Sequence, residues 1–213
     1  MREEIAVKVC GLTLEEDVNR CLDLGADYCG FIVYEASPRG IALVRAQELS
    51  SNVPAGKRVL VDVAPRLEVL MTYLDAGFDF FQIHEKETFD EGYLEAVSEL
   101  VGKNRLWLSP RFGPDQPFPE AYLHFADTFL VDTFSKDQVG GTGQTGDWGA
   151  FSTLKNRYPQ KQWILAGGLS PSNIREAVAL SDSTHVDVNS GVESRAGVKE
   201  LEKLQVFFRA LRG

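Results

Sequence analysis

Apolar residues occur along the chain in eight short runs of strand length, rich in Val, Ile, Leu and aromatic residues. Most of the runs are continuous rather than alternating with polar positions, which is typical of parallel strands buried on both faces. They cover residues 5–10, 28–33, 58–63, 78–83, 105–108, 128–132, 163–166 and 184–188. The pattern therefore predicts eight buried strands.

Amphipathic segments with helical spacing separate these strands. They cover residues 14–24, 44–49, 66–76, 89–101, 148–158, 171–180 and 198–211. Thr13, followed by acidic residues, is a candidate N-cap for the first helix, and Pro171 fits near the first position of the sixth predicted segment. The fifth repeat is the exception, because four prolines within residues 110–119 forbid a regular helix. An irregular loop and a short helix near residues 120–125 are expected there.

Eight strand–helix repeats are the number that closes a (β/α)8 barrel. The predicted fold class is therefore α/β, a TIM barrel, with residues 1–213 forming a single catalytic domain. The competing architecture is an open, doubly wound sheet. That fold usually carries a glycine-rich nucleotide fingerprint after its first strand, and no GxGxxG motif follows the first strand here.

Composition narrows the class of function. The chain has 22 basic and 31 acidic residues, a net charge of −9, which argues against a nucleic-acid surface. No apolar stretch is long enough to span a membrane, and the N-terminal Met1-Arg2-Glu3-Glu4 does not resemble a secretory signal. Three cysteines without a CxxC pair predict neither a disulfide framework nor a metal site. The expected location is the cytoplasm.

The thiol of Cys10 stands where the first strand runs into a loop, just before Gly11. In a barrel of alternating strands and helices, a side chain at the C-terminal end of a strand faces the catalytic mouth. A lone cysteine is more often a small buried hydrophobe than a reactive group. The position of Cys10 therefore makes it a candidate base only if the rest of the chain supplies partners.

The last two strands end in glycine-containing loops that suit an anion. Gly167 and Gly168 follow the seventh strand, and Ser190 and Gly191 follow the eighth. Loops at these two positions form the common phosphate site of barrel enzymes. The alternative is a pair of ordinary glycine turns. Their joint position at the ends of the last two strands favours phosphate binding.

Asp132 ends the sixth strand, which is otherwise apolar. We expect partial desolvation at the mouth, which raises a carboxyl pKa and suits a proton donor. A helix cap or a surface ion pair is the structural alternative. A glycine-rich loop follows at residues 140–148, and it could either fold over a ligand or bind nothing.

Six segments, in this order along the chain, resemble motifs of the phosphoribosylanthranilate isomerase family. They are Lys8-Val9-Cys10-Gly11-Leu12-Thr13, Ser37-Pro38-Arg39, Gln82-Ile83-His84, residues 140–148, Ala166-Gly167-Gly168-Leu169 and residues 186–193. The segments span nearly the whole chain. Cys-Gly-Leu-Thr at the start together with Gly-Gly-Thr-Gly-Gln-Thr at residues 140–145 is the most specific combination.

The resemblance implies a (β/α)8 enzyme of tryptophan biosynthesis that needs neither metal nor cofactor. It would convert N-(5-phosphoribosyl)anthranilate, a small phosphorylated substrate, into the 1-deoxyribulose phosphate product by an Amadori rearrangement. By resemblance, Cys10 is the base and Asp132 the acid, and Arg39 holds the anthranilate carboxylate. The further residues that the resemblance places at the substrate are Gln82, His84, Asp187 and, for the phosphate, Gly141, Gly143, Gly167, Gly168, Ser190 and Gly191.

An ordinary thiol is only slightly ionised at neutral pH, so we expect positive potential near Cys10, from Lys8 or from helix ends. Several residues depart from the family pattern. Glu35-Ala36 replaces Pro-Lys, Glu85 replaces a glycine, and Gly146 replaces a loop phenylalanine. We expect the added acids to weaken binding of an anionic substrate and the glycine to loosen the loop.

Two other functions compete with this one. The first is a related barrel enzyme that performs an Amadori rearrangement on a histidine-pathway substrate, but such enzymes use paired aspartates rather than a cysteine after the first strand. The second is a catalytically silent barrel that binds a phosphorylated metabolite, against which Cys10 and Asp132 argue. The pattern does not decide between a monomer and a homodimer.

Overall fold

Eight parallel strands form a closed barrel in the computed structural model, which describes residues 4–112, 116–133 and 147–212. The strands pair in sequence order, and β1 pairs with β8 to close the ring. They are β1 (Ala6–Val9), β2 (Tyr28–Ile32), β3 (Arg58–Val63), β4 (Phe80–His84), β5 (Leu106–Ser109), β6 (Thr128–Asp132), β7 (Gln162–Ala166) and β8 (His185–Val188). The predicted fold class is confirmed, because the apolar runs do form the strands of one barrel.

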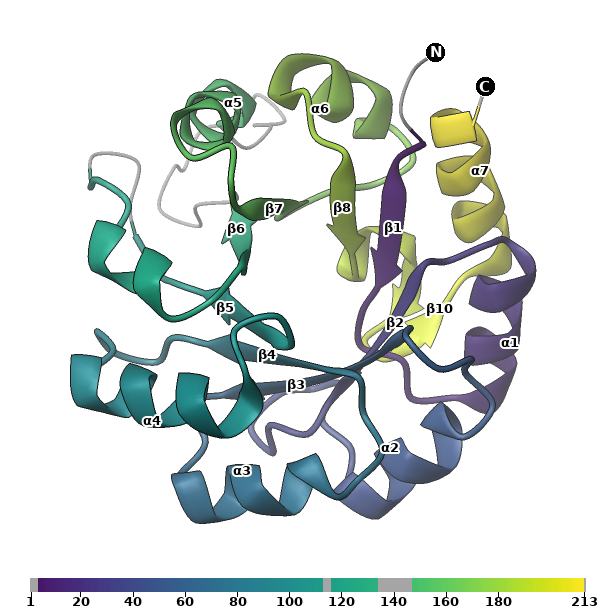
Figure 1. The fold of residues 1–213 in the computed structure, drawn as a ribbon. Helices are drawn as coiled ribbons and strands as arrows, with labels where there is room; N and C mark the ends of the chain where they lie inside the picture. The colour runs from purple at the N-terminus through teal and green to yellow at the C-terminus, as the bar shows by residue number, and fades with distance from the viewer. Residues whose placement is uncertain (1–3, 113–115, 134–146, 213) are drawn as a thin grey trace.

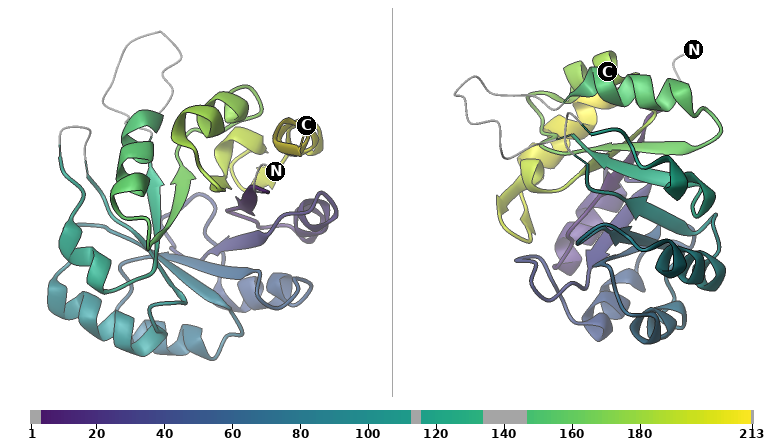
Figure 2. Two further views of the ribbon diagram at one scale, coloured as in Figure 1. Left: turned by 45° about the horizontal axis from the view of Figure 1, so that its top comes forward. Right: turned by 90° about the vertical axis from the view of Figure 1, so that its left-hand side faces the viewer.

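Helices surround the barrel and cover the outer face of the strands (Figure 1). They are α1 (Glu15–Asp23), α2 (Leu43–Ser50), α3 (Leu67–Leu74), α4 (Glu91–Val101), α5 (Trp148–Arg157), α6 (Ile174–Ser181) and α7 (Leu201–Arg212). The layer is seen from two further sides in Figure 2. In the fifth repeat the described residues contain only a short 3-10 helix, η1 (Glu120–His124), as the prolines predict.

Three helix starts differ from the sequence prediction. Thr13 does not cap α1, because its hydroxyl donates to the Gly197 carbonyl at 2.5 Å and Leu14 takes the cap position without a side-chain bond. Helix α6 begins at Ile174 rather than at Pro171, which lies in the preceding turn. Val198 belongs to a two-stranded hairpin of β9 (Glu193–Arg195) and β10 (Val198–Lys199), and α7 begins only after it. In the first and third cases a tertiary contact replaces the local preference.

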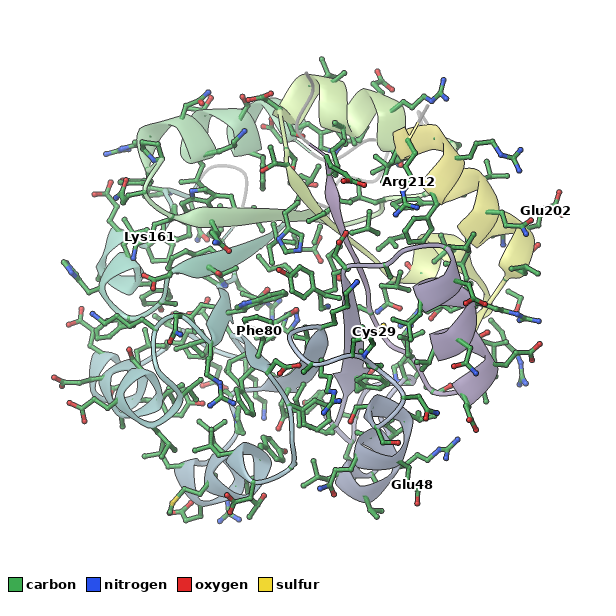
Figure 3. The ribbon with its side chains drawn as sticks, turned by 45° about the vertical axis from the view of Figure 1, so that its right-hand side comes forward. Cys29, Glu48, Phe80, Lys161, Glu202 and Arg212 are labelled. Carbon is green, nitrogen blue, oxygen red and sulfur yellow. The ribbon has the colours of Figure 1, made fainter. Side chains whose placement is uncertain are left out.

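Alternation along the strands produces two separate cores. Side chains that point outward, such as Cys29, pack under the helices, whereas a smaller set that includes Val61, Trp107 and Ile164 fills the barrel. Figure 3 shows Phe80 directed into the centre of the ring, while Glu48 and Glu202 lie on the outer helices. The interior is therefore packed with side chains, and a ligand can enter only at a mouth.

An aromatic cluster fills the barrel at the N-terminal ends of the strands. Tyr28 stacks on His185 with ring centroids 5.0 Å apart and meets Trp107 edge to face at 5.0 Å. His185 is buried, and its Nε2 atom has no hydrogen-bond partner among the described residues. Burial, helped by the nearby charge of Lys8, lowers the pKa of His185 to about 3. The imidazole is therefore neutral in the folded protein at any pH well above 3.

We predict that His185 makes the fold sensitive to acid. Its pKa rises from about 3 in the folded chain to an ordinary value of about 6.5 in the unfolded chain, so the unfolded state binds an extra proton between these values. Stability falls as the pH falls through this window, by about 1.4 kcal/mol per pH unit. His185→Phe should remove the contribution of this one proton, so the unfolding free energy should depend less steeply on pH, by about 1.4 kcal/mol per pH unit. Urea unfolding at several pH values measures this slope. His124→Gln, at an exposed position, is the control, and an unchanged slope in His185→Phe would contradict the prediction.

Candidate active site

The C-terminal ends of the strands gather the predicted site residues at one mouth of the barrel. Cys10 directly follows β1, its side chain belongs to the inner core, and it is only 4% exposed. Its backbone N–H donates to the Val188 carbonyl at 2.9 Å, which fixes the loop to the end of β8. The thiol is thus held at the floor of the mouth by the pairing of the first and last strands.

A buried ion pair lies beside this thiol. Lys8 precedes Cys10 by two residues on β1, so both point into the barrel, and Lys8 is fully buried. Its Nζ atom donates to Oδ1 of Asp187 on β8 at 2.9 Å. The register places Lys8 and Asp187 directly opposite each other on the paired strands. Both residues are predicted site residues or their neighbours, but their direct contact follows only from the strand pairing.

Gly30 on β2 leaves the space in which the thiol and the ammonium group meet. A β-carbon at this position would lie 2.9 Å from Nζ of Lys8 and 3.0 Å from Sγ of Cys10. Both atoms therefore border the same small volume, and any larger residue at position 30 would displace one of them. Gly30 is not among the predicted site residues, because a glycine in the middle of a strand gives no sign of which atoms fill the space beside it.

The environment of Cys10 raises the pKa of its thiol rather than lowering it. Burial is the largest cause, and the Asp187 carboxylate adds to it, while Lys8 and, more weakly, Lys199 act in the opposite direction. The expected positive potential is present in Lys8, but desolvation outweighs it in the unliganded protein. Cys10 is accordingly a thiol, not a thiolate, at neutral pH before a ligand binds.

Arg39 is held by a glutamate. Its Nε donates to both carboxylate oxygens of Glu193, at 2.9 and 3.1 Å, and its Nη2 donates to Oε2 at 2.7 Å. Nζ of Lys199 donates to the same carboxylate at 2.9 Å. A β-carbon on Gly11 would lie 2.8 Å from Cδ of Arg39, so the arginine passes next to the residue that follows Cys10. Arg39 and Lys199 share one carboxylate, so this cluster of three side chains carries one net positive charge.

The Glu193 carboxylate stays ionised in this cluster. Burial alone would raise its pKa, but the hydrogen bonds and charges of Arg39 and Lys199 outweigh burial and hold the pKa below its usual value. Neither Glu193 nor Lys199 is a predicted partner of Arg39. The two residues lie in the β9–β10 hairpin, which the apolar pattern did not reveal.

Gln82 and His84 lie together at the end of β4. Their Nε2 atoms are 2.6 Å apart, and burial, with the nearby Lys8 charge, lowers the pKa of His84 to about 4. The imidazole is therefore neutral and can accept a hydrogen bond from the Gln82 amide. Oε1 of Gln82 is buried without a partner among the described residues. The pair thus places a buried amide beside a neutral, partly exposed imidazole at the end of β4.

Asp132 ends β6, three strands away from Cys10 through β7 and β8. The side chain is exposed, so the expected partial desolvation of this carboxylate is wrong for the unliganded structure. The reason is its position as the last residue of the strand, beyond the buried Val131. Asp132 and His84 border a cleft of about 1100 Å³ that continues toward Arg111, Phe118 and α5.

The loops after β7 and β8 touch each other. Gly167 and Gly168 have φ values of 93° and 62°, which side chains other than glycine rarely adopt. A β-carbon on Gly191 would lie 1.9 Å from the Leu169 carbonyl oxygen, so only glycine fits between the two loops. The structure therefore brings together the four described residues predicted to bind phosphate, namely Gly167, Gly168, Ser190 and Gly191. Gly141, Gly143 and the departure at Gly146 lie outside the described residues.

The two acids that depart from the family pattern have different surroundings. Glu35 is exposed, whereas Glu85 is 6% exposed and its carboxylate is fully engaged within the protein. It accepts hydrogen bonds from the Phe89 N–H at 2.8 Å, the Tyr122 hydroxyl at 2.7 Å and the Arg111 N–H at 2.5 Å. Glu85 thus joins the loop before α4, the loop after β5 and η1. These contacts give Glu85 a structural role beyond the expected electrostatic one.

In the described part of the chain, no group of three or more His, Cys, Asp and Glu side chains is placed to hold a metal ion. No helix among these residues combines the length and apolar character that crossing a membrane requires.

A (β/α)8 barrel with acid–base side chains at the C-terminal mouth is the architecture of a barrel enzyme. The family model for N-(5'-phosphoribosyl)anthranilate isomerase matches residues 7–210. The curated isomerase of this name from Paramagnetospirillum magneticum is 36% identical over 215 residues, covering 98% of each chain. The chain belongs to the N-(5'-phosphoribosyl)anthranilate isomerase family.

Solved structures agree with this assignment. A structure of the monomeric form of the dimeric phosphoribosylanthranilate isomerase from Thermotoga maritima has a TM-score of 0.79 and 27% identity, covering 98% of this chain and 99% of that one. A phosphoribosylanthranilate isomerase in complex with reduced 1-(o-carboxyphenylamino)-1-deoxyribulose 5-phosphate has a TM-score of 0.76 and 26% identity, with coverages of 98% and 99%. Both likenesses extend over the full barrel.

We predict that Glu85→Gln destabilises the fold. The amide keeps one acceptor oxygen and turns N–H donors toward groups that are themselves donors, so buried hydrogen bonds are lost. The free energy of unfolding should fall by about 1–3 kcal/mol, measured by urea denaturation at neutral pH. Glu87→Gln, at an exposed position in the same loop, is the matched control. Equal stability of the two variants would contradict the structural role.

Proposed function

We propose that this chain catalyses the Amadori rearrangement of N-(5'-phosphoribosyl)anthranilate to 1-(2-carboxyphenylamino)-1-deoxyribulose 5-phosphate in tryptophan biosynthesis. One observation carries the proposal: Cys10 directly follows β1, Asp132 ends β6, and the two touching glycine loops follow β7 and β8, which lie between these two strands in the barrel. A sugar phosphate anchored by these loops has one face toward each group. Family membership supplies the substrate.

The reaction needs two proton transfers. Asp132, in its acid form, gives a proton to the furanose ring oxygen, and the C1'–O bond breaks to leave an iminium ion. Cys10, in its thiolate form, then removes the proton from C2', and the electron pair of that bond forms the enolamine. A proton then adds to C1' while the C2' hydroxyl loses its proton, which leaves the ketone at C2'. Every step moves only protons and electron pairs within the substrate, so no cofactor is required.

The cationic cluster at Arg39 is the proposed site of the anthranilate carboxylate. Arg39 and Lys199 together carry one positive charge more than Glu193 neutralises. Glu193 also fixes the orientation of the guanidinium before a ligand arrives, which reduces the entropy lost on binding. A carboxylate beside this cluster would lie next to Gly11, close to the thiol that acts on the sugar.

The remaining predicted residues fit around the sugar. Gln82 and Asp187 are also proposed to contact the sugar, and the neutral imidazole of His84 can bind a hydroxyl group. Gly167, Gly168, Ser190 and Gly191 are the proposed phosphate ligands. We further infer that residues 1–213 act as one catalytic domain in the cytoplasm. Monomer and homodimer remain the two predicted states.

We predict that Cys10→Ser and Asp132→Asn each lower kcat by about 10²–10⁴-fold, because each removes one positioned acid or base. Steady-state turnover of the purified variants measures this, and binding of the reduced product analogue, measured by calorimetry, should survive in both. Growth rescue of a tryptophan auxotroph lacking this isomerase tests the function itself. A wild-type chain that neither rescues growth nor turns over substrate, yet binds the analogue, would be the silent binding protein.

Arg39→Ala should raise KM by about 10–100-fold and change kcat much less, because a charge-assisted contact to the substrate carboxylate is lost. The kinetics of Arg45→Ala, which removes an exposed arginine paired with Glu48, provide the control. If KM of Arg39→Ala equals that of the control, the carboxylate binds elsewhere.

A further inference from the structure

A fully buried lysine inside a barrel requires an explanation. Removing an ammonium group from water is costly unless charged and hydrogen-bonding partners surround it. Lys8 has one carboxylate partner, Asp187, whose side chain is 11% exposed. Replacement of such a pair by apolar residues of similar volume is often neutral or stabilising in other proteins. Packing alone therefore does not account for a charged pair at this position.

The ion pair lies directly beside the reactive thiol. Nζ of Lys8 and Sγ of Cys10 both lie within 3.0 Å of the point where a β-carbon of Gly30 would be, so the ammonium group that binds Asp187 also lies beside the thiol. One ammonium group thus faces two groups that can carry negative charge. We propose that Lys8 is the counter-ion of the Cys10 thiolate and that Asp187 competes with the thiolate for this single ammonium group.

The other charged or titratable groups on the elements around Cys10 are paired, neutral or exposed to solvent. Arg39, in the loop after β2, and Lys199, on β10, both bind Glu193. His84 on β4 is neutral above pH 4, and Asp132 on β6 is exposed. Lys8 is the cation that borders the same small space beside Gly30 as the sulfur, and at low effective dielectric its charge acts on the thiol more strongly than the charge of Lys199.

The proposal assigns opposite effects to the two members of one ion pair. Without Lys8, the thiolate loses its counter-ion and forms less readily. Without the charge of Asp187, the ammonium group is available to the thiolate alone, which then forms more readily. A ligand hydroxyl that binds Asp187 would act in the same direction as the loss of its charge, so that substrate binding itself would favour the base form of Cys10.

The inference rests on the proposed role of Cys10 as the base, but its test needs no turnover. The rate of alkylation of Cys10 by iodoacetamide is measured between pH 6 and 11, and the adduct is quantified by mass spectrometry of the Cys10 peptide. The measured quantity is the pH midpoint, because the plateau rate itself changes with thiol basicity. Cys21 and Cys29 are fully buried, so adducts on them report loosening of the fold.

Lys8→Met should raise the midpoint by about one pH unit or more, which slows alkylation about tenfold at a fixed pH below the midpoint. Asp187→Asn should lower the midpoint by a similar amount and accelerate alkylation there. Gly30→Ala, which keeps both charges, should raise the midpoint, because its methyl group separates the ammonium from the sulfur. Arg45→Met, at a surface ion pair, should leave it unchanged.

Lys8→Met leaves Asp187 unpaired and could fail to fold, so the double variant Lys8→Met/Asp187→Asn keeps the proposal testable. It lacks both charges, and its midpoint should lie above that of Asp187→Asn. A purely structural ion pair predicts that every variant accelerates alkylation of all three cysteines. The proposal would be overturned if the midpoints of Lys8→Met and Asp187→Asn move in the same direction or do not move, or if the midpoint of the double variant does not lie above that of Asp187→Asn. Wild-type turnover, measured separately, tests the proposed function independently of this result.

Discussion

The pairing of β1 with β8 is the constraint on which the rest of this structure depends. It closes the barrel, and it places Lys8 opposite Asp187 and Cys10 against the end of β8. The charged pair therefore lies across the seam where the first and last strands of the chain meet. Residues separated by 179 positions in sequence form this contact, so the arrangement around the thiol exists only once the barrel has closed.

An acidic protein can bind an anion when its cations are concentrated. The net charge is −9, yet Lys8, Arg39 and Lys199 gather at one mouth of the barrel. Two carboxylates, the buried Glu193 and the partly buried Asp187, keep these cations in fixed positions. The local potential at the mouth is thus set by a few paired groups, and the charge of the outer helices contributes to solubility instead.

The fifth repeat shows how a barrel tolerates the loss of a helix. Prolines prevent a regular helix after β5, and aromatic side chains such as Phe118 and Tyr122 cover the exposed flank of the strands. Glu85 joins this irregular segment to the end of β4 with three hydrogen bonds. Glu85, the residue after His84, thus fixes one wall of the cleft that Asp132 also borders.

The sequence by itself determined the eight strands, the irregular fifth repeat, the family and several of the residues at the mouth, because each is encoded in local periodicity, in prolines or in short motifs. The β9–β10 hairpin escaped prediction, because its strands are too short for a periodic signal and depend on contacts with Thr13 and α7. Only the tertiary structure decided which charges pair, that Asp132 is exposed, and that Glu85 is buried. It also decided the state of Cys10, because burial and the distances to Lys8 and Asp187 arise from packing between strands that are distant in the chain.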